Sequence, residues 1–528
     1  MGWGEVSAQY TISDGETKTL ADLGASTTGF ETLTVESGGT LQLANGNTGS
    51  TSDTITITGT GDGTVVGTTP HGAIYSPIVS GVWANVVIDG SASVTSYAEN
   101  TGSLRLRFQG NVTGGELTTY ATQSSGVANI AEIHAGMTST FNISKLIVAQ
   151  GNFTFCGVSG TDSVETHTHY FAEGITVNSG ANLRSWSEKR LYLYTSTEET
   201  DLATITLSSG SSYRSENTAN TLFANFVLNG STTFSGYSTL DIGSSDAAEP
   251  NTCISGTGTL NVNGITLSLH DGNTYSGGTG IGASATLRIS HANATGTGTV
   301  TLNEAGRLEL DGIAEGMTFE LGGLAGGGVT TVYSGSANNV TLQVGSANGS
   351  QTYSGVLSNS SGKMLSVEKV GTGTWTLTGN STYTGNTTIS GGTLDLQGSL
   401  ASTQQVQLNS GATLRLSSNA SVPGGVATQK DTTTRLIFDG YTVKEGTWAI
   451  RAGSTTEIGE GGLNQTGGNY YIAETTFTVS EGVTEATASY NNTAAGSGSK
   501  ITLDIGSEQT LNFQTVVKDY IDDKGVSP

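Results

Sequence analysis

Cationic and aromatic side chains gather in one short stretch, RSWSEKRLYLY, between residues 184 and 194. Guanidinium groups present several fixed hydrogen-bond donors, and aromatic rings stack on apolar faces such as those of sugars. On irregular segments such side chains are frequent contact-makers at binding surfaces. We therefore predict that this stretch contacts a ligand. The predicted contact residues are Arg184, Trp186, Lys189, Arg190, Tyr192 and Tyr194.

A second candidate is the alternation of acidic and imidazole side chains in VETHTHYF. Glu165, His167 and His169 stand two residues apart, so a strand would place all three on one face. Two imidazoles and one carboxylate are ligands that zinc or iron accepts. The sequence offers no fourth ligand beside them, and the outward face of a strand explains the same spacing. We therefore expect neither a metal nor another cofactor.

Glu309 and Asp311 are a third candidate, because glycosidases use two carboxyl groups ~5–9 Å apart. Arg288, however, precedes Glu309 by 21 residues, and Asp395 precedes Arg415 by 20. Opposite charges at this recurring interval predict outward-facing ion pairs between neighbouring repeats, each contributing ~0–1 kcal/mol. The sequence also lacks a Gly-x-Ser-x-Gly elbow, a phosphate-binding loop and a calcium-binding repeat. We therefore expect no catalytic centre.

Short strands are the elements that would position these residues. A nine-residue frame recurs, with apolar residues at its first, third and last positions and a polar corner between them. Copies of the frame span residues 33–41, 175–183, 205–213, 300–308 and 406–414. Their period of roughly 20 residues, made only of strands and corners, predicts an all-β solenoid whose coils stack ~4.8 Å apart.

The period also predicts which side chains lie inside the solenoid. Alternation places four leucines in the core, namely Leu287, Leu308, Leu394 and Leu414. It places the neighbouring Arg288, Glu309, Asp395 and Arg415 on the outer face. The corner asparagines Asn178, Asn303 and Asn409 are expected to favour the turn, because Asn tolerates the left-handed conformation.

The clearest repeat carries a family resemblance. Within residues 369–400, the tract GTGTWTLTGNSTYTGNTTISGGTLDL resembles the passenger-associated repeat of bacterial autotransporters, and a looser copy covers 256–312. The resemblance implies a right-handed parallel β-helix that is exported to the surface of a Gram-negative cell. It implies no particular activity, because passengers that share the repeat differ in what they do.

Composition restricts the partners of the 528-residue chain. Its formal net charge is −24, so its surface repels nucleic acid and anionic membranes. No apolar run is long enough for a transmembrane helix. Cys156 and Cys253 lie 97 residues apart, between four and five coils, which places them roughly 20 Å apart along the solenoid. We therefore expect no disulfide between them.

The expected organisation is a solenoid with different ends. Residues 1–24 form an N-terminal cap, and residues 25–422 form the parallel β-helix. Irregular insertions occupy 111–255, with a short helical turn at 128–137. Residues 423–528 form a β-rich C-terminal cap or small sandwich, in which alternating runs such as Arg435–Phe438 and Thr447–Ile450 pair as antiparallel strands.

Two functions fit these observations. The first is an exported passenger, surface-displayed or secreted, that acts as a monomeric adhesin or structural stalk. It would bind host or environmental glycan or protein without catalysis. The alternative is a polysaccharide lyase or glycoside hydrolase on a β-helix scaffold. That alternative needs acidic and basic side chains that converge from adjacent coils and are flanked by aromatic rings.

Overall fold

The computed structural model describes residues 9–514 with short gaps, and from residue 440 onward it describes only strands. The gaps before residue 440 are 26–29, 44–45, 51, 64, 67–68, 78–79, 99–103, 124–130, 136–138, 157–165, 187–189, 217–219, 361, 403 and 429–432. The chain divides into two compact units, residues 1–277 and 278–528. The described residues contain no helix, and hence no helix that could cross a membrane.

Each nine-residue frame folds as two strands joined by a tight turn. In the copy at 175–183, the N–H of Ala181 donates to the carbonyl of Asn178 at 3.0 Å, and Gly180 between them has a φ of 76°. The turn at 406–414 repeats this geometry, with Gly411 at a φ of 75°. The left-handed residue is therefore the glycine, which has no Cβ to clash. The expectation that the corner asparagines adopt this conformation is wrong.

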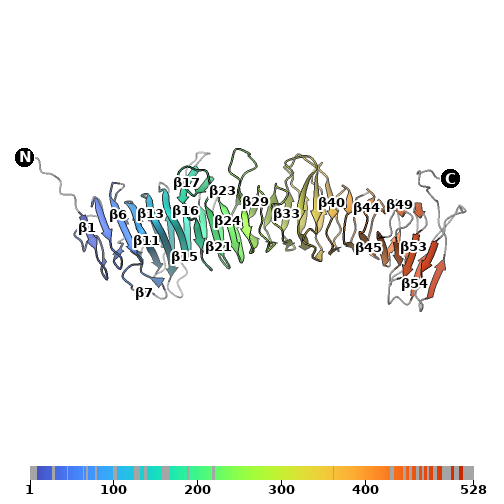
Figure 1. Cartoon of the computed structure of the whole chain (residues 1–528), viewed down its shortest axis with the longest axis horizontal. Coiled ribbons are helices and arrows are strands. Elements are labelled where there is room, and N and C mark those ends of the chain that lie inside the picture. The colour runs from blue at the N-terminus through green and yellow to red at the C-terminus, as the bar shows by residue number, and fades with distance from the viewer. Residues whose placement is uncertain are drawn as a thin grey trace, which may run out of the picture. The chain divides into compact units, whose positions relative to one another are not determined.

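In the first unit, strands of successive coils pair in parallel and lie side by side in chain order (Figure 1). One series, here called the β5–β28 sheet, consists of β5 (Gly46–Thr48), β10 (Ser80–Val82), β12 (Leu104–Phe108), β14 (Ala131–Ala135), β16 (Asn152–Cys156), β19 (Asn182–Trp186), β22 (Ser212–Ser215), β25 (Ser231–Gly236) and β28 (Thr259–Asn263). This sheet carries the candidate site.

Two further parallel series complete the coils of this unit. The first consists of β1 (Gln9–Ile12), β3 (Thr32–Val35), β6 (Thr54–Gly59), β11 (Asn85–Ala98), β13 (Val112–Gln123), β15 (Phe141–Gln150), β18 (Ile175–Val177), β21 (Thr204–Ser208), β24 (Asn225–Asn229) and β27 (Ile254–Gly256). The second consists of β2 (Thr17–Lys18), β4 (Thr40–Gln42), β9 (Ile74–Ser76), β17 (Thr166–Phe171), β20 (Arg190–Tyr194), β23 (Asn220–Phe223), β26 (Thr239–Ile242) and β29 (Thr266–Leu269). A small antiparallel hairpin joins β7 (Val65–Val66) to β8 (Thr69–Pro70).

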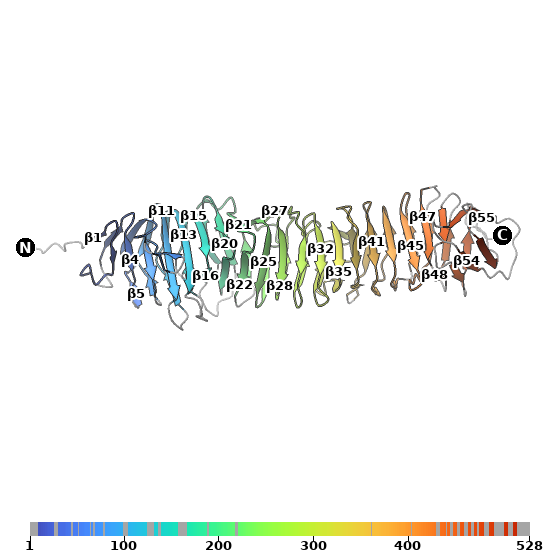
Figure 2. The same cartoon turned by 90° about the horizontal axis from the view of Figure 1, so that it is seen from below.

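The second unit is built in the same way, with parallel strands that follow one another in chain order (Figure 2). One series consists of β30 (Thr279–Ile281), β32 (Thr299–Leu302), β35 (Gly323–Gly326), β38 (Gln351–Tyr353), β41 (Thr374–Leu377), β43 (Thr393–Leu396), β45 (Thr413–Ser417), β47 (Arg435–Asp439), β50 (Thr455–Ile458), β53 (Thr475–Val479) and β55 (Ile501–Asp504). A second consists of β34 (Met317–Leu321), β37 (Val340–Val344), β40 (Leu365–Lys369), β42 (Thr387–Ile389), β44 (Val406–Leu408), β46 (Val426–Thr428), β49 (Thr447–Ile450) and β52 (Asn469–Ile472). Shorter series are β31 (Thr286–Ile289), β33 (Arg307–Leu310), β36 (Val329–Val332) and β39 (Val356–Ser358), and β48 (Tyr441–Val443), β51 (Leu463–Gln465), β54 (Glu485–Ser489) and β56 (Thr510–Gln514).

Strands beyond residue 422 continue the parallel coils. β47 pairs with β45 in parallel, with Leu436 opposite Leu414, and β53 pairs with β55 in the same sense. The expectation of antiparallel pairing in this region is wrong. The interval from Leu414 to Leu436 is still close to one coil, so in-register parallel pairing needs no reversal of the chain.

The core of the second unit follows the predicted alternation. Leu287, Leu308, Leu394 and Leu414 are each at most 1% exposed, as predicted. Trp375 on β41 is also buried, and its indole N–H donates to the carbonyl of Leu324 on β35 at 3.0 Å. Strand β38 lies between β35 and β41, so this bond spans two coils.

The predicted cross-coil charge register is confirmed. Arg288 lies opposite Glu309, and its guanidinium nitrogens donate to the carboxylate at 2.9 and 3.0 Å. Asp395 likewise lies opposite Arg415. Glu309 points outward but is only 8% exposed, because Arg288 and Arg307 both bond to it.

Two expectations for the irregular region have different outcomes. The helical turn at 128–137 is wrong in its described part, where Ala131–Ala135 is strand β14. Ile133 faces the core there, and its neighbours Glu132 and His134 belong to the outer face, which is the period of a strand. Cys156 and Cys253 are not joined in a disulfide, as expected.

Candidate functional site

The outer face of the β5–β28 sheet holds the candidate site. On β12, Leu106 and Phe108 are buried in the core, so alternation turns Arg105 outward. On β19, Leu183 is buried in the same way, and Arg184 and Trp186 face outward. The strands position these side chains because inward apolar residues fix the register of each coil.

Parallel register brings residues from six successive coils onto one surface. Arg105 on β12 lies opposite Glu132 on β14. Thr154 on β16 lies opposite Arg184 on β19, which in turn lies opposite Arg214 on β22. Neighbouring strands are ~4.8 Å apart, so long side chains reach across a strand that carries a short one.

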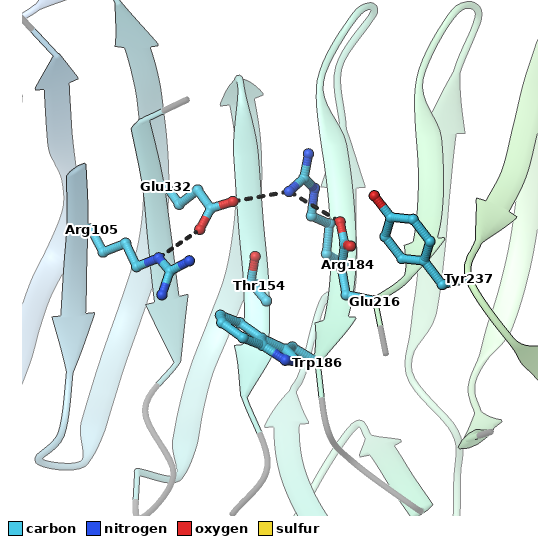
Figure 3. Close-up of a pocket in the computed structure, with 7 residues that line it drawn as sticks. All are labelled: Arg105, Glu132, Thr154, Arg184, Trp186, Glu216 and Tyr237. Atoms are coloured by element: carbon cyan, nitrogen blue, oxygen red, sulfur yellow. Dashed lines mark hydrogen bonds and ion pairs between the residues drawn. The ribbon is translucent and has the colours of Figure 1, made fainter. Parts of the chain in front are cut away.

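These side chains line a groove of about 290 Å³, shown in Figure 3. We call it the charged groove. Its lining residues are Arg105, Glu132, Thr154, Arg184, Trp186, Glu216 and Tyr237. All of them belong to the first unit.

A network of ion pairs runs along the charged groove (Figure 3). Glu132 accepts from Arg105 at 3.2 Å and, across β16, from Arg184 at 2.9 Å. Arg184 also pairs with Glu216 at 3.2 Å, and Glu216 pairs with Arg214 at 2.7 Å. The small Thr154 side chain leaves the space over which Arg184 reaches Glu132. Three arginines therefore share two carboxylates, which leaves this surface locally cationic in an acidic protein.

Aromatic rings lie beside the ion pairs. The Arg105 guanidinium lies 4.7 Å from the centre of the Trp186 ring, and that of Arg214 lies 4.8 Å from the Tyr237 ring. Tyr237 is 72% exposed, which is unusual for a large aromatic side chain. Two aromatic rings and fixed charged donors and acceptors make a surface suited to a ligand with an apolar face and several hydroxyl groups.

Two buried polar atoms of the charged groove have unused hydrogen-bonding capacity. The hydroxyl of Thr154, a residue only 1% exposed, has no hydrogen-bond partner among the described residues, and neither has Nε of Arg184. Figure 3 shows Thr154 between Glu132 and Arg184. Leaving a buried polar group unpaired costs about 1–3 kcal/mol, so a ligand hydroxyl that bonded there would gain from its removal.

Electrostatics keep Glu132 ionised. Burial acts to raise its pKa, but the hydrogen bond and charge of His134 and the charges of Arg184 and Arg105 outweigh burial and hold the pKa below its usual range. For Arg184, burial lowers the pKa and the two glutamates partly offset this effect. At neutral pH Glu132 is therefore an acceptor of hydrogen bonds rather than a donor of protons.

The six predicted contact residues fall in different places. Arg184 and Trp186 line the charged groove, whereas Lys189 lies outside the described residues. Arg190, Tyr192 and Tyr194 lie on β20, which belongs to another strand series. The structure therefore brings together two of the six predicted residues in this groove.

The β20 side chains form a packed cluster. Tyr192 and Tyr194 are buried with Leu202 and Phe223, and the Tyr192 ring stacks on Phe223 at 4.4 Å. The Tyr192 hydroxyl donates to Glu249 at 2.7 Å, and Arg190 pairs with the same carboxylate at 2.5 Å. Burial, followed by this hydrogen bond, raises the pKa of Tyr192 to about 12. Ligand contact by these residues stays a prediction.

The histidine pattern in β17 is described only in part. Glu165 lies outside the described residues. His169 is buried, and its Nδ1 accepts from the backbone N–H of Phe141 at 3.1 Å. Burial lowers the pKa of His169 to about 3, so this ring is neutral. Among the described residues, no three His, Cys, Asp or Glu side chains form a group that could hold a metal ion.

Sequence reasoning missed most of the charged groove. Arg105, Glu132, Thr154, Glu216 and Tyr237 were not predicted, because the coils that carry them differ in length. Thr154 and Arg184 are 30 residues apart, whereas Arg214 and Ser235, also opposite each other, are 21 apart. The available signal was the alternation in LRLRF, which places two arginines on one strand face.

Comparison with known proteins identifies one segment of the chain. Residues 367–396 match the family model described as passenger-associated-transport-repeat. The match covers β41, β42 and β43 and the end of β40. No curated protein and no solved structure matches the chain. The repeat and the parallel β-solenoid together fit the passenger domain of an autotransporter, which is an exported part of such proteins.

Proposed function

With a passenger-associated transport repeat in a parallel β-solenoid as the premise, we propose that this chain is a surface-displayed or secreted passenger that binds carbohydrate. The observation that carries the proposal is the charged groove, in which Trp186 and Tyr237 accompany a fixed network of arginines and glutamates. Sugar rings offer an apolar face to aromatic side chains and hydroxyl groups to charged ones. The unpaired hydroxyl of Thr154 adds a further bonding position.

The ion pairs favour binding over catalysis. A glycoside hydrolase needs a carboxyl group whose pKa is raised, so that it carries a proton to the leaving group. The pKa of Glu132 is shifted in the opposite direction. Both glutamates are instead engaged with arginines, and this arrangement supports a rigid, preorganised binding surface. The role is thus that of an adhesin, with the second unit as part of the stalk.

A glycan array probed with the full chain tests this proposal. Trp186→Ala and Tyr237→Ala should each weaken binding to the best glycan at least tenfold, since a stacked aromatic ring contributes about 1–3 kcal/mol. Trp83→Ala is the matched control, because Trp83 is 37% exposed and lies outside the charged groove. Equal loss in the Trp83 variant, or no bound glycan, would contradict the proposal.

The same samples distinguish the enzymatic alternative. The bound glycans are incubated with the chain, and new reducing ends and unsaturated uronates are measured. We expect neither product above the background of a Glu132→Gln variant. Release that depends on Glu132 would replace the adhesin with a polysaccharide lyase or hydrolase.

A further inference from the structure

Cys156, His134 and Glu132 form a hydrogen-bonded row on the outer face of β14 and β16. Sγ of Cys156 lies 3.0 Å from Nδ1 of His134. On the other side of the ring, Nε2 lies 2.8 Å from Oε2 of Glu132. A thiol beside an imidazole that is in turn held by a carboxylate is the arrangement of an activated nucleophile, its base and an orienting group.

The contacts define the protonation of His134. The ionised carboxylate of Glu132 has no hydrogen to donate, so Nε2 must carry the hydrogen of this bond. In the neutral ring Nδ1 is then a lone-pair acceptor, and the thiol of Cys156 is positioned to donate to it. Glu132 is itself held by Arg105 and Arg184, which prevents it from turning away from the ring.

The charges around the row come from every strand that packs against it. Arg105 and Arg107 lie on β12, Glu132 on β14 and Arg184 on β19. Burial lowers the pKa of His134, the bond and charge of Glu132 partly restore it, and the two β12 arginines lower it again. His134 is therefore neutral at pH 7 and able to accept a proton. The nearby cations favour a thiolate once it forms.

Trp186 covers this row. It lies opposite Cys156 in the strand register, and its ring meets that of His134 edge-on at 6.0 Å. Cys156 is 9% exposed, so a small part of it reaches the surface beside the indole. The indole therefore limits access to the thiol, and small reagents have a route that large ones lack.

The chain contains no second thiol beside Cys156. Its other cysteine, Cys253, directly precedes β27 on another strand series. From β16 the β5–β28 sheet takes four coils to reach β28, the strand that follows β27, or roughly 19 Å along the solenoid at the strand spacing. A disulfide formed by Cys156 with another molecule would therefore have no neighbouring thiol to resolve it.

We propose that Cys156 is the nucleophile of a thiol–disulfide exchange site that links this chain covalently to a disulfide-bearing partner. The proton of the Cys156 thiol passes to Nδ1 of His134, and the thiolate attacks one sulfur of the partner's disulfide. A new disulfide forms between Cys156 and that sulfur. The other partner sulfur leaves as a thiolate and takes the proton from His134. Two electrons pass from Cys156 and the attacked sulfur to the departing thiol, so the partner's disulfide is the only oxidant.

The proposal rests on the export of the chain, because disulfides persist outside the cell and not in the cytosol. It does not rest on carbohydrate binding. The two ideas share Glu132 and Trp186 but predict different measurements, so a failed glycan array leaves the thiol chemistry intact.

Two single-cysteine variants of the full chain test the proposal with dithiodipyridine, a small neutral disulfide. Cys253→Ser leaves Cys156, and Cys156→Ser leaves the half-buried Cys253 as an internal reference. At pH 6 we expect Cys156 to react at least ten times faster, because a positioned base contributes about 10²–10⁴-fold. The rate of Cys253 should fall steeply below pH 8, as for an ordinary thiol. With oxidised glutathione, Cys156 should retain one glutathione per chain.

Variants of the neighbours separate activation from access. In the Cys253→Ser background, His134→Gln should lower the rate at pH 6 at least tenfold, and Trp186→Ala should raise it. The pH profiles of the two single-cysteine proteins need no change at His134, so they decide the matter even if that variant fails to fold. Equal pH profiles for Cys156 and Cys253, or no reaction of Cys156 even in Trp186→Ala, would overturn the proposal.

Discussion

Replacing Glu309 with Gln removes a negative charge that two arginines share. Oε2 accepts from Nε and Nη2 of Arg288 at 3.0 and 2.9 Å, and Oε1 accepts from Nε of Arg307 at 2.8 Å. A glutamine keeps one acceptor oxygen, but its amide N–H₂ group must face the other arginine. The Glu309 side chain is 11% exposed, that of Arg288 24% and that of Arg307 45%.

These exposures set the expected loss of stability. Breaking a fully buried ion pair costs about 3–5 kcal/mol, whereas an exposed pair is worth about 0–1 kcal/mol. The Arg288 pair lies between these limits, and Arg288 is also held over the Tyr333 ring at 3.7 Å. We therefore expect Glu309→Gln to lower the local opening free energy by about 2–3 kcal/mol, above the sequence-based value of ~0–1 kcal/mol.

Native-state hydrogen exchange on peptides from β31 and β33 measures this change. Amide exchange should accelerate roughly 30- to 150-fold in Glu309→Gln, since about 1.4 kcal/mol corresponds to a factor of ten. Arg307→Ala is the matched control, and it should accelerate exchange less than about fivefold because that side chain is nearly half exposed. If Glu309→Gln changed the rate less than threefold, or no more than Arg307→Ala, the burial argument would be refuted.

Two further changes test the coil interior. Leu394→Ala should lower the free energy of unfolding by about 2–5 kcal/mol, because Leu394 is buried between Trp375 and Leu414, whereas Thr393→Ala, at a partly exposed position, should cost far less; urea unfolding followed by circular dichroism measures both. Lys369 is buried, its ammonium donates to backbone carbonyls of Val370, Gly371 and Gly391, and burial lowers its pKa from 10.5 to about 8. Between these values the unfolded chain binds a proton that the folded chain has released, so stability should rise from pH 8 to pH 10.5. Lys369→Met should remove this rise in the urea midpoint, and an unchanged slope would show that the lysine is not its cause.

The solenoid and its regular coils follow from the sequence because their period is nearly constant. The spacing of Leu394 and Leu414 equals one coil, and the same spacing places Arg288 opposite Glu309. Parallel stacking repeats each position at one interval, so a period in the sequence becomes a row in space. The parallel pairing beyond residue 422 was missed because composition changes there while the coil length hardly does.

The charged groove was not predictable in the same way. Arg105 and Glu132 are 27 residues apart, and Arg184 follows Glu132 by 52, so no single period connects them. The contact between Arg184 and Glu132 also skips β16, which only a short side chain at Thr154 permits. Likewise, Cys156 and His134 are not opposite each other in the strand register, since His134 lies opposite Thr154. Such diagonal contacts depend on side-chain reach rather than on spacing.

The bond from Trp375 to the carbonyl of Leu324 has a consequence for the order in which the chain assembles. In a solenoid whose coils contact only their neighbours, stability is a sum over adjacent pairs, and each new coil completes the one before it. Here the donor lies 51 residues after the acceptor, and β38 must already be in place between them. During growth from the N-terminal side, β35 therefore waits for two further coils before its last buried bond forms. During unravelling from the C-terminal side, the loss of β41 weakens two coils at once, so this part of the solenoid should yield in a step larger than one coil.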